Sequence, residues 1–257
     1  MNYTYTVLTE KQTEKYLYRI NFKGISNNSL ECLNQLIYCH HTSVPFENLD
    51  IYYQKLPLSL EINDLFDKIV TRKRGGYCFE MNGLFICLLR TLGFNAWSCM
   101  CRVTHDENTP RPISHRGNMV IIDNKHYFCD VGFGGPMPCG ALLLEDGKTQ
   151  EILGEEFTPI LTNEGWWKIM RGNQCTLMVN EAFLDPVDFI PLSDACSLKE
   201  SAIFRKQIMV NLRTKTGHLS ITANTFTKVI DGIREEYTIT SKDELRTILD
   251  KYFELSL

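Results

Sequence analysis

The sequence contains no apolar run long enough to cross a lipid bilayer. Its longest unbroken hydrophobic stretch, residues 84–89, is far shorter than the roughly 20 residues of a membrane-spanning helix. The first residues lack the basic and apolar regions of a signal peptide. No cluster of lysine and arginine stands out as a footprint for nucleic acid or anionic lipid. We therefore expect a cytoplasmic protein without nucleic-acid or membrane partners.

Cysteine is too scarce for a disulfide scaffold of this length, although ten cysteines among 257 residues are many for a cytosolic chain. In a reducing compartment most of them should behave as small buried hydrophobic residues. Apolar residues form 44% of the chain and its net charge is −4, which is ordinary for a globular protein with a sizeable core. The open question is whether one cysteine is a nucleophile or a metal ligand.

Helical patterns dominate the first third of the chain. Ser29 is a candidate N-cap for a helix over residues 30–40, and Ser59 for another over residues 59–70. The clearest helix begins near Cys78 and ends before Gly93, because apolar side chains recur at helical spacing between them and glycine commonly follows a helix. Cys78 is therefore expected in the first turn of a helix.

Short strand-like patterns follow Gly93. Residues 119–122 and 126–129, with Asp123-Asn124-Lys125 between them, predict a β-hairpin. Ser241 is a candidate N-cap for a closing helix, with Glu244 completing a capping box. Further strands are expected at residues 96–103, 167–170, 176–179, 207–212 and 218–221. Helices first, strands in the middle and a mixed end predict an α+β protein.

Cys78 has the surroundings of a reactive thiol. A thiolate at a helix N-terminus is stabilised by the partial positive charge there and by free backbone N–H groups. Lys73 and Arg74 add positive charge nearby in the sequence. Position alone slightly favours a plain buried cysteine, because buried free cysteines are common.

His115 and Asp130 add the partners that a cysteine nucleophile needs. Such a thiol requires a base, and the base requires an acceptor that orients it. We expect His115 just before the first hairpin strand and Asp130 at the end of the second, opposite about residue 118 or 119. Because the two ends of a hairpin meet, these side chains should lie within reach of each other. Either residue alone is more ordinary as a loop or strand-end residue, but with Cys78 they form a candidate catalytic set.

Three motifs in order resemble those of the arylamine N-acetyltransferases. Residues 74–80, Arg-Gly-Gly-Tyr-Cys-Phe-Glu, resemble the RGG-x-C-x-E signature of that family. Residues 44–50 (Val-Pro-Phe-Glu-Asn-Leu-Asp) resemble its PFEN-L segment, and residues 130–134 (Asp-Val-Gly-Phe-Gly) its D-[AV]-GFG segment. The spacing of cysteine, histidine and aspartate is also similar. With further likeness at residues 16–20 and 201–204, the resemblance covers nearly the whole chain.

The resemblance implies an architecture. It implies a helical domain over residues 1–93 that carries the nucleophile, a β-barrel-like domain over 94–195 that carries the histidine and aspartate, and an α/β lid domain over 196–257. The catalytic core would be similar to that of papain-like cysteine proteases and transglutaminases. The family's catalytic triad is matched by Cys78, His115 and Asp130.

The resemblance also implies a reaction. The donor substrate would be acetyl-CoA and the acceptor an arylamine, arylhydrazine or N-hydroxyarylamine, with no tightly bound cofactor and no metal. In a ping-pong sequence Cys78 would take the acetyl group, and His115 would then act as base and acid for the attacking amine. The backbone N–H of Cys78 is a candidate oxyanion donor, because it lies at a helix start.

Aromatic and glycine residues in these motifs are candidates for ligand contacts. Four phenylalanines are candidates to line an acceptor pocket, although any single one is more often core: Phe46, Phe79, Phe133 and Phe204. The candidates for contact with CoA are Gly132, Phe133, Gly134 and Phe204. Tight-turn geometry explains the glycines equally well.

Two further features concern the surroundings of the triad. Glu47 and Arg74 are expected to form a structural ion pair that shapes the cysteine loop. Arg116, Gly117 and Asn118 stand where the family often has apolar residues. We expect these three beside the active site, with an effect on acceptor preference.

Two other kinds of function are compatible with the same residues. A cysteine hydrolase or transglutaminase-like enzyme uses the same triad, and an inactive binding module can share the fold. Acetyl-CoA-dependent acetylation of an aniline or hydrazine would distinguish an acetyltransferase from a hydrolase or a transglutaminase-like enzyme. A zinc site is disfavoured because its candidate ligands do not match paired C-x2-C spacing: Cys99, Cys101, Cys129, Cys139 and His105 or His126.

Overall fold

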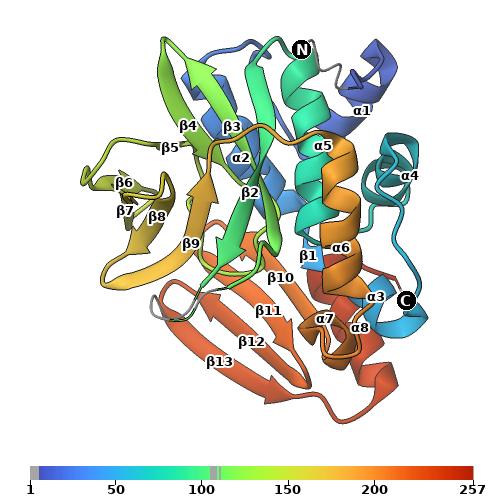
Figure 1. Ribbon diagram of the computed structural model, residues 1–257. Coiled ribbons are helices and arrows are strands. Elements are labelled where there is room, and N and C mark those ends of the chain that lie inside the picture. Colours follow the sequence, from blue (N-terminus) through green and yellow to red (C-terminus); the bar gives the residue numbers. More distant parts are fainter. Residues whose placement is uncertain (1–5, 105–108, 110, 257) are drawn as a thin grey trace.

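A computed structural model describes residues 6–104, 109 and 111–256, which form a group of helices and two antiparallel sheets (Figure 1). The predicted α+β class is therefore confirmed. The first five residues and His105 lie outside the described residues. Within the described part of the chain, no helix is both long and apolar enough to traverse a bilayer.

The helical part of the chain begins with α1 (Glu10–Arg19) and α2 (Leu30–Ser43). Ser29 caps α2 as predicted, since its hydroxyl accepts a hydrogen bond from the backbone N–H of Cys32 at 3.2 Å. The helices that follow are α3 (Leu49–Gln54), α4 (Ile62–Phe66), the π-helical turn η1 (Asp67–Thr71) and α5 (Cys78–Thr91).

The predicted helix over residues 59–70 begins too early. Ser59 does not cap it, because its hydroxyl instead accepts from the backbone N–H of Glu61 at 3.2 Å and closes a turn before the helix. The helix starts at Ile62 and ends in the π-helical turn η1. That turn contains Lys68, whose side chain is buried.

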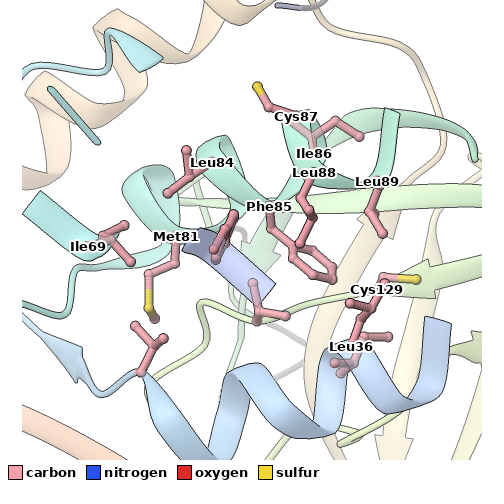
Figure 2. Packing of buried hydrophobic residues seen from close by; sticks show 14 of the residues in the cluster. Leu36, Ile69, Met81, Leu84, Phe85, Ile86, Cys87, Leu88, Leu89 and Cys129 are labelled. Carbon is pink, nitrogen blue, oxygen red and sulfur yellow. The ribbon is translucent and has the colours of Figure 1, made fainter. Parts of the chain in front are cut away.

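Helix α5 is the centre of the larger hydrophobic core, and residues 78–89 of it are all buried. A helix that is apolar around most of its circumference belongs inside a protein. Leu84, Phe85, Leu88 and Leu89 pack in one cluster with Leu36 of α2, and Cys129 belongs to it too (Figure 2). The helix ends at Thr91 with Leu92 as its C-cap, and Gly93 follows with φ +88°, as the glycine signal predicted.

An eight-stranded antiparallel sheet carries the strands in the order β5-β4-β3-β2-β9-β8-β7-β6. Its strands are β2 (Asn95–Val103), β3 (His115–Ile122), β4 (Lys125–Cys129), β5 (Leu142–Leu143), β6 (Gln150–Ile152), β7 (Glu155–Leu161), β8 (Trp167–Arg171) and β9 (Gln174–Asn180). The predicted hairpin is β3–β4, with Asp123 and Asn124 both at positive φ in its turn. His115 is the first residue of β3 rather than a loop residue, and Cys129 pairs with Asn118.

A second sheet of five strands has the order β1-β10-β11-β12-β13. Its strands are β1 (Phe46–Glu47), β10 (Met209–Thr214), β11 (Gly217–Thr222), β12 (Thr225–Ile230) and β13 (Ile233–Thr238). Helix α8 (Lys242–Phe253) packs against it in a separate core. Ser241 caps α8, but the Glu244 carboxylate accepts from the backbone N–H of Thr240, so the predicted capping box is displaced by one residue.

Two short helices between the sheets were not predicted. They are α6 (Phe189–Ser197) and α7 (Ile203–Lys206), and α6 runs beside α5 (Figure 1). Helix α6 was not expected because Pro191 is usually a signal against a helix, although proline is well tolerated in the first turn. Residue 195, the predicted limit of the second domain, falls inside α6. The division into three domains stays a prediction.

Candidate active site

Cys78 is the first residue of α5, and its side chain is buried. The loop before it is fixed by a parallel bridge between Gly76 and Phe46. The carboxylate of Glu80 accepts from the backbone N–H of Tyr77 at 3.0 Å and so closes the first turn of the helix. The thiol therefore sits at a helix N-terminus, as the sequence predicted.

His115 lies between Cys78 and Asp130. Its Nε2 is 2.6 Å from Oδ2 of Asp130, and Cys78 lies close enough to the ring to help raise its pKa. Because Nε2 faces the aspartate, Nδ1 is the nitrogen left for the sulfur. Burial alone would lower the pKa of His115, but Asp130 and Cys78 outweigh it and raise that pKa to about 10. The structure thus unites the three residues that the sequence proposed.

The Asp130 carboxylate is buried, and both of its oxygens have hydrogen-bond partners. Its Oδ1 accepts from Nδ2 of Asn82 and from the backbone N–H of Gly132, both at 2.8 Å. Burial would raise the pKa of this carboxyl group, yet His115 and these hydrogen bonds together lower it. The carboxylate is therefore held ionised and in one orientation.

Asn82 is a site residue that sequence analysis missed. Its Nδ2 donates to Asp130 and also to the backbone carbonyl of Arg116 at 2.7 Å. Its Oδ1 accepts from the backbone N–H of Val131 at 3.1 Å and from Nδ2 of Asn118 at 3.2 Å. The one available signal was its position four residues after Cys78, which places it on the same face of the helix.

Gly132 is explained by a close approach rather than by a positive φ. A Cβ atom there would lie 2.8 Å from Cα of Cys78 and 2.8 Å from Nδ2 of Asn82. The loop after Asp130 therefore touches the start of α5 through a residue without a side chain. Gly134 is similar, because a Cβ there would lie 2.8 Å from the ring of Phe46.

The two neighbouring histidines of α2 have different roles. His40 is enclosed in the core, where its Nε2 is 3.0 Å from the hydroxyl of Tyr16. His41 Nε2 is 2.8 Å from the backbone carbonyl of Asp130, and burial lowers the pKa of His41. No sequence signal linked His41 to the triad, because the contact spans 89 positions of the chain.

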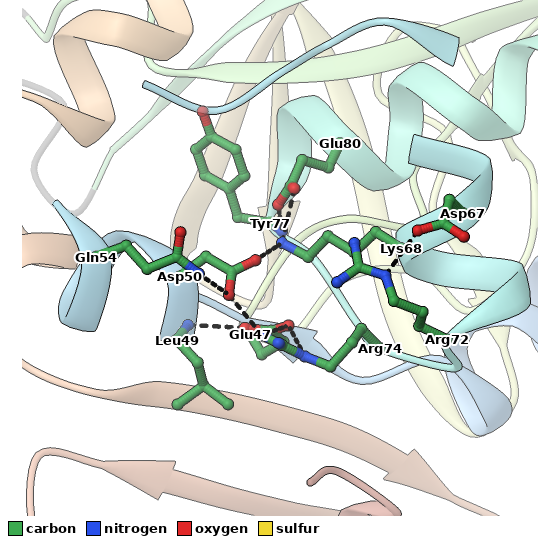
Figure 3. Close-up of polar contacts among 10 residues, drawn as sticks. All are labelled: Glu47, Leu49, Asp50, Gln54, Asp67, Lys68, Arg72, Arg74, Tyr77 and Glu80. Atoms are coloured by element: carbon green, nitrogen blue, oxygen red, sulfur yellow. Dashed lines mark hydrogen bonds and ion pairs between the residues drawn. The ribbon is translucent and has the colours of Figure 1, made fainter. Parts of the chain in front are cut away.

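A network of five charged side chains surrounds the start of α5 (Figure 3). Arg74 contacts Glu47 at 2.7 Å, which confirms the predicted ion pair, and Asp50 at 3.0 Å. Lys68 contacts Asp50 at 2.8 Å and Glu80 at 2.7 Å. Burial alone would lower the pKa of Lys68, but the surrounding carboxylates raise it above its usual value. This network holds the cysteine loop, the π-helical turn and α3 together.

A cavity of about 260 Å³ lies next to the triad. Its walls include Phe46, Met81, Val131 and Phe133, so residues beside Cys78 and Asp130 in the sequence form one end. The ring of Phe133 stands edge-on to His115, with 5.3 Å between ring centroids. Two of the four predicted pocket phenylalanines therefore line this cavity.

The remaining two phenylalanines lie elsewhere. Phe204 packs beside Phe46 and Tyr77, with ring centroids 6.0 Å and 5.9 Å apart. Phe79 is fully buried between Tyr77 and Phe189 in the hydrophobic core. The structure gives Phe79 a packing role, because its ring has no exposed surface.

Comparison with known proteins identifies the family. A family model described as N-acetyltransferase matches residues 29–257. The chain belongs to the arylamine N-acetyltransferase family.

Relatives of known sequence support this membership. An arylamine N-acetyltransferase / N-hydroxyarylamine O-acetyltransferase of Salmonella typhimurium is 34% identical over 155 residues, which cover 59% of this chain and 54% of that protein. The match thus spans about half the length of that relative. Arylamine N-acetyltransferase 1 of Homo sapiens is 27% identical over 275 residues, which cover 95% of this chain and 94% of the human protein.

Solved arylamine N-acetyltransferase structures share the fold. The enzyme from Salmonella typhimurium aligns with a TM-score of 0.88 and 26% identity, over 96% of this chain and 92% of that one. The Mycobacterium marinum enzyme in complex with CoA aligns with a TM-score of 0.87 and 26% identity, over 94% and 92%. The fold that the resemblance implied is therefore confirmed, because this chain shares it with solved arylamine N-acetyltransferases.

The three residues that depart from the usual arylamine N-acetyltransferase pattern make contacts inside the protein. Arg116 is buried, donates to the hydroxyl of Ser98 and lies 4.4 Å above the ring of Phe189. Asn118 bonds Ser98 and Asn82. A Cβ at Gly117 would lie 2.5 Å from the ring of Phe128. Asn118 thus contacts the triad indirectly, through Asn82. The effect of the three residues on acceptor preference stays a prediction.

The cysteines weighed as zinc ligands are dispersed in the structure. Cys99 and Cys101 are buried inside the eight-stranded sheet, whereas Cys129 belongs to the core around α5. His126 contacts the carboxylate of Glu181. Among residues 6–104, 109 and 111–256, no group of three or more histidine, cysteine, aspartate or glutamate side chains is arranged so that it could hold a metal ion.

Proposed function

We propose that this chain transfers the acetyl group of acetyl-CoA to the amine of arylamines and arylhydrazines and to the hydroxyl of N-hydroxyarylamines. The observation that carries the proposal is the buried His115 ring, whose Nε2 lies 2.6 Å from Oδ2 of Asp130 and whose pKa is raised by Asp130 and Cys78 together. That arrangement suits attack on a thioester, because the imidazole takes the thiol proton and leaves a soft nucleophile. The names of the relatives agree with this reaction.

In the first half-reaction the Cys78 thiolate attacks the thioester carbonyl of acetyl-CoA. The bond between the acetyl carbon and the sulfur of CoA breaks, and His115 gives its proton to the departing CoA thiolate. The backbone N–H of Cys78 is the candidate donor to the developing oxyanion. The product is an acetyl-Cys78 thioester and free CoA.

In the second half-reaction the acceptor amine attacks acetyl-Cys78. His115 removes a proton from the amine and returns it to the Cys78 sulfur as the thioester bond breaks. Asp130 fixes the ring and stabilises the imidazolium without taking the proton itself. Asn82 and Gly132 keep the Asp130 carboxylate in place for both steps.

The ligands are small molecules in this proposal. Acetyl-CoA is a substrate rather than a resident cofactor, with Gly132, Phe133, Gly134 and Phe204 as its proposed contacts. Phe46 and Phe133 are proposed to contact the acceptor ring. We place the reaction in the cytoplasm, where acceptors would include foreign aromatic amines.

Mass spectrometry of the intact protein with acetyl-CoA alone tests the proposal. We expect one acetyl group, on the peptide that contains Cys78, and none in Cys78→Ala, which should unfold at nearly the wild-type temperature. Adding aniline should discharge the adduct as acetanilide, and two-substrate initial rates should give parallel lines. A stable wild type that never acquires the acetyl group, or that passes it only to water, would overturn the transferase assignment and favour a hydrolase.

A further inference from the structure

Helix α6 has an unusual inner face, because most of its buried residues are polar. The buried residues of α6 are Phe189, Ser193 and Ser197. Their spacing of four places them on one face of the helix, and Figure 1 shows α6 running beside α5. Buried hydroxyl groups need hydrogen-bond partners. The partners of this face therefore show what it holds.

On one side, α6 contacts both sequence neighbours of Cys78. The hydroxyl of Ser193 hydrogen-bonds the hydroxyl of Tyr77, the residue before the cysteine. The ring of Phe189 lies against that of Phe79, the residue after it, with 6.3 Å between ring centroids. Burial raises the pKa of Tyr77 well above its usual range, so this hydroxyl stays neutral and keeps the bond. The first turn of α5 is thus fixed against α6.

On the other side, α6 contacts both sequence neighbours of His115. The thiol of Cys196 donates to the backbone carbonyl of Ser114, with 3.7 Å between sulfur and oxygen. The guanidinium group of Arg116 lies 4.4 Å above the ring of Phe189. Burial raises the pKa of Cys196 to about 12, so its thiol keeps the proton that it donates. The start of β3 is thus fixed against the same helix.

These four contacts fall on the residues directly before and after Cys78 and directly before and after His115. Phe189 serves both sides, because its ring faces Phe79 and Arg116. The proposed nucleophile and base are carried by different elements, α5 and β3. A helix that contacts both elements at these points fixes their separation. An error of about 1 Å in such a separation can slow a reaction about a hundredfold.

We propose that α6 sets the distance between the sulfur of Cys78 and the ring of His115, with Ser193 and Cys196 as positioning residues. The inference rests on the proposed function, which makes these two groups the nucleophile and the base. Ser193 and Cys196 each act through the residue that precedes one of them in the chain. Their role adds to that of Asn82, which bonds the carboxylate of the triad.

Two measurements separate positioning from plain stability. Alkylation of Cys78 by iodoacetamide, followed on its peptide by mass spectrometry as a function of pH, reports the reactivity of the sulfur without any acetyl donor. Stopped-flow acetylation by acetyl-CoA reports the first half-reaction and its KM. A displaced His115 ring changes the rate of acetylation and the pH profile of alkylation. A helix that is only less stable changes neither in the folded protein.

Ser193→Ala and Tyr77→Phe each remove one half of the same hydrogen bond. We expect acetylation to slow about tenfold in either variant and no further in the double variant, because the two partners of one bond are not additive. The KM for acetyl-CoA should change less than about twofold, because the lost interaction does not bind the donor. The midpoint of the alkylation profile should move to higher pH, since the ring that takes the thiol proton is less well placed.

The base side is tested in the same way. Cys196→Ala should also slow acetylation, and Cys196→Ser should recover part of the rate, because its hydroxyl keeps a donor for the Ser114 carbonyl. Ser197→Ala is the matched control. It removes another buried serine of the same face, whose hydroxyl donates to the carbonyl of Ser193 in its own helix at 2.8 Å. This variant should react as the wild type does.

The outcomes separate this inference from the proposed function. Wild-type rates and an unchanged pH profile in Ser193→Ala or in Cys196→Ala would overturn the positioning role. Equal losses in Ser197→Ala would overturn it too, because they would reflect the stability of the helix alone. A shifted alkylation profile in variants of a protein that acetyl-CoA never acetylates would support the positioning role and contradict the proposed function.

Discussion

Asn82 is the side chain that ties the parts of the triad together. It bonds Asp130, the carbonyl of Arg116 and the N–H of Val131, which all belong to β3 or to the loop after β4. Because Cys78 is on the same helix, Asn82 fixes the distance between the proposed nucleophile and the His115–Asp130 pair. It is a positioning residue rather than a catalytic one.

Replacement of this amide should therefore slow the chemistry as well as weaken the fold. We expect Asn82→Leu to lower the rate of Cys78 acetylation at least about tenfold, or roughly 1.4 kcal/mol, and to lower the free energy of unfolding by about 1–3 kcal/mol. Stopped-flow acetylation and urea denaturation measure the two effects. Asn118→Leu is the matched control, because Asn118 donates to Oδ1 of Asn82, whereas the Asp130 carboxylate is bonded by Asn82, Gly132 and His115. It should lose stability while the acetylation rate changes little, and an equal loss of rate would count against a positioning role for Asn82.

The ionisation of His115 predicts how stability depends on pH. Its pKa is raised to about 10 in the folded protein, against about 6.5 in an unfolded chain. The folded state therefore binds the proton more tightly. This contribution to stability is complete below about pH 6.5 and is lost as the pH rises towards 10.

Urea denaturation at pH 7 and pH 9 measures this effect. The free energy of unfolding of the wild type should fall between these values, by at most about 1.4 kcal/mol per pH unit from this residue. His115→Gln cannot be protonated and should show a smaller fall. Equal falls in both proteins would mean that the ring is not protonated in the folded state. Asp130 affects stability at acidic pH instead. Because its pKa is lowered in the folded protein, its contribution to the free energy of unfolding is lost only as the pH falls into the acid range.

The proximity of the three proposed catalytic residues could be predicted from the sequence, but the residues that support them could not. Cys78, His115 and Asp130 belong to a known chemical set, and the hairpin brings two of them together. Asn82 and His41 are ordinary in type, and only the folded contacts reveal what they hold. Phe79 was a candidate for a ligand contact because it lies beside Cys78 in the sequence, and the structure places its ring in the hydrophobic core.

At the scale of secondary structure, the buried charges around α5 determine how the cysteine loop is held. Lys68 enters the network from the π-helical turn, and both Glu80 and Lys68 are nearly inaccessible to water. Removing Lys68 leaves the buried Glu80 carboxylate without its opposite charge, whereas Asp50 keeps its contact with Arg74.

Lys68→Met should accordingly lower the free energy of unfolding by about 3–5 kcal/mol. Arg72→Ala is the matched control, because Arg72 forms an exposed ion pair with Asp67 in the same stretch of chain. Exposed pairs contribute about 0–1 kcal/mol. Urea denaturation of both variants at pH 7 measures the difference, and similar losses would show that the buried network contributes little.

Elements with strong local signals were predicted well. Helix α5 has a long apolar pattern and a terminating glycine, and the β3–β4 hairpin has residues suited to a tight turn. The start of α4 and all of α6 were not, because Ser59 closes a turn instead of capping a helix and Pro191 resembles a helix breaker. In both cases the same residue type allows two local structures, because serine can close a turn or cap a helix and proline is tolerated in the first turn of a helix.

At the scale of the whole molecule, one short segment joins the two hydrophobic cores. Phe46 belongs to the core around α5, and Leu49 belongs to the core under α8. Between them Glu47 enters the charged network. Asn48 donates to the carbonyls of Phe204 and Gln207 at 2.8 Å. The resemblance located this segment, but no sequence pattern revealed that each of its residues has a different partner.

Loss of the Asn48 amide should loosen the C-terminal sheet more than the rest. It also accepts from the backbone N–H of Met209 at 2.7 Å, so Asn48→Ala leaves several buried groups unpaired. We expect the free energy of unfolding to fall by about 2–4 kcal/mol. Hydrogen exchange should become faster in β10–β13 than in β2–β4. Asn95→Ala, at an exposed position, is the control, and uniformly faster exchange in Asn48→Ala would contradict a local link.

The contact of Phe46 with Gly134 has a consequence for engineering. Phe46 is two residues from Asn48, and its ring is both a wall of the cavity and the neighbour of Gly134. A substitution in the C-terminal layer that displaces Asn48 should therefore also displace the Phe46 ring in the wall of the cavity. Directed evolution towards bulkier acceptors should find useful substitutions in that layer, far from the reacting atoms, as readily as in the pocket itself.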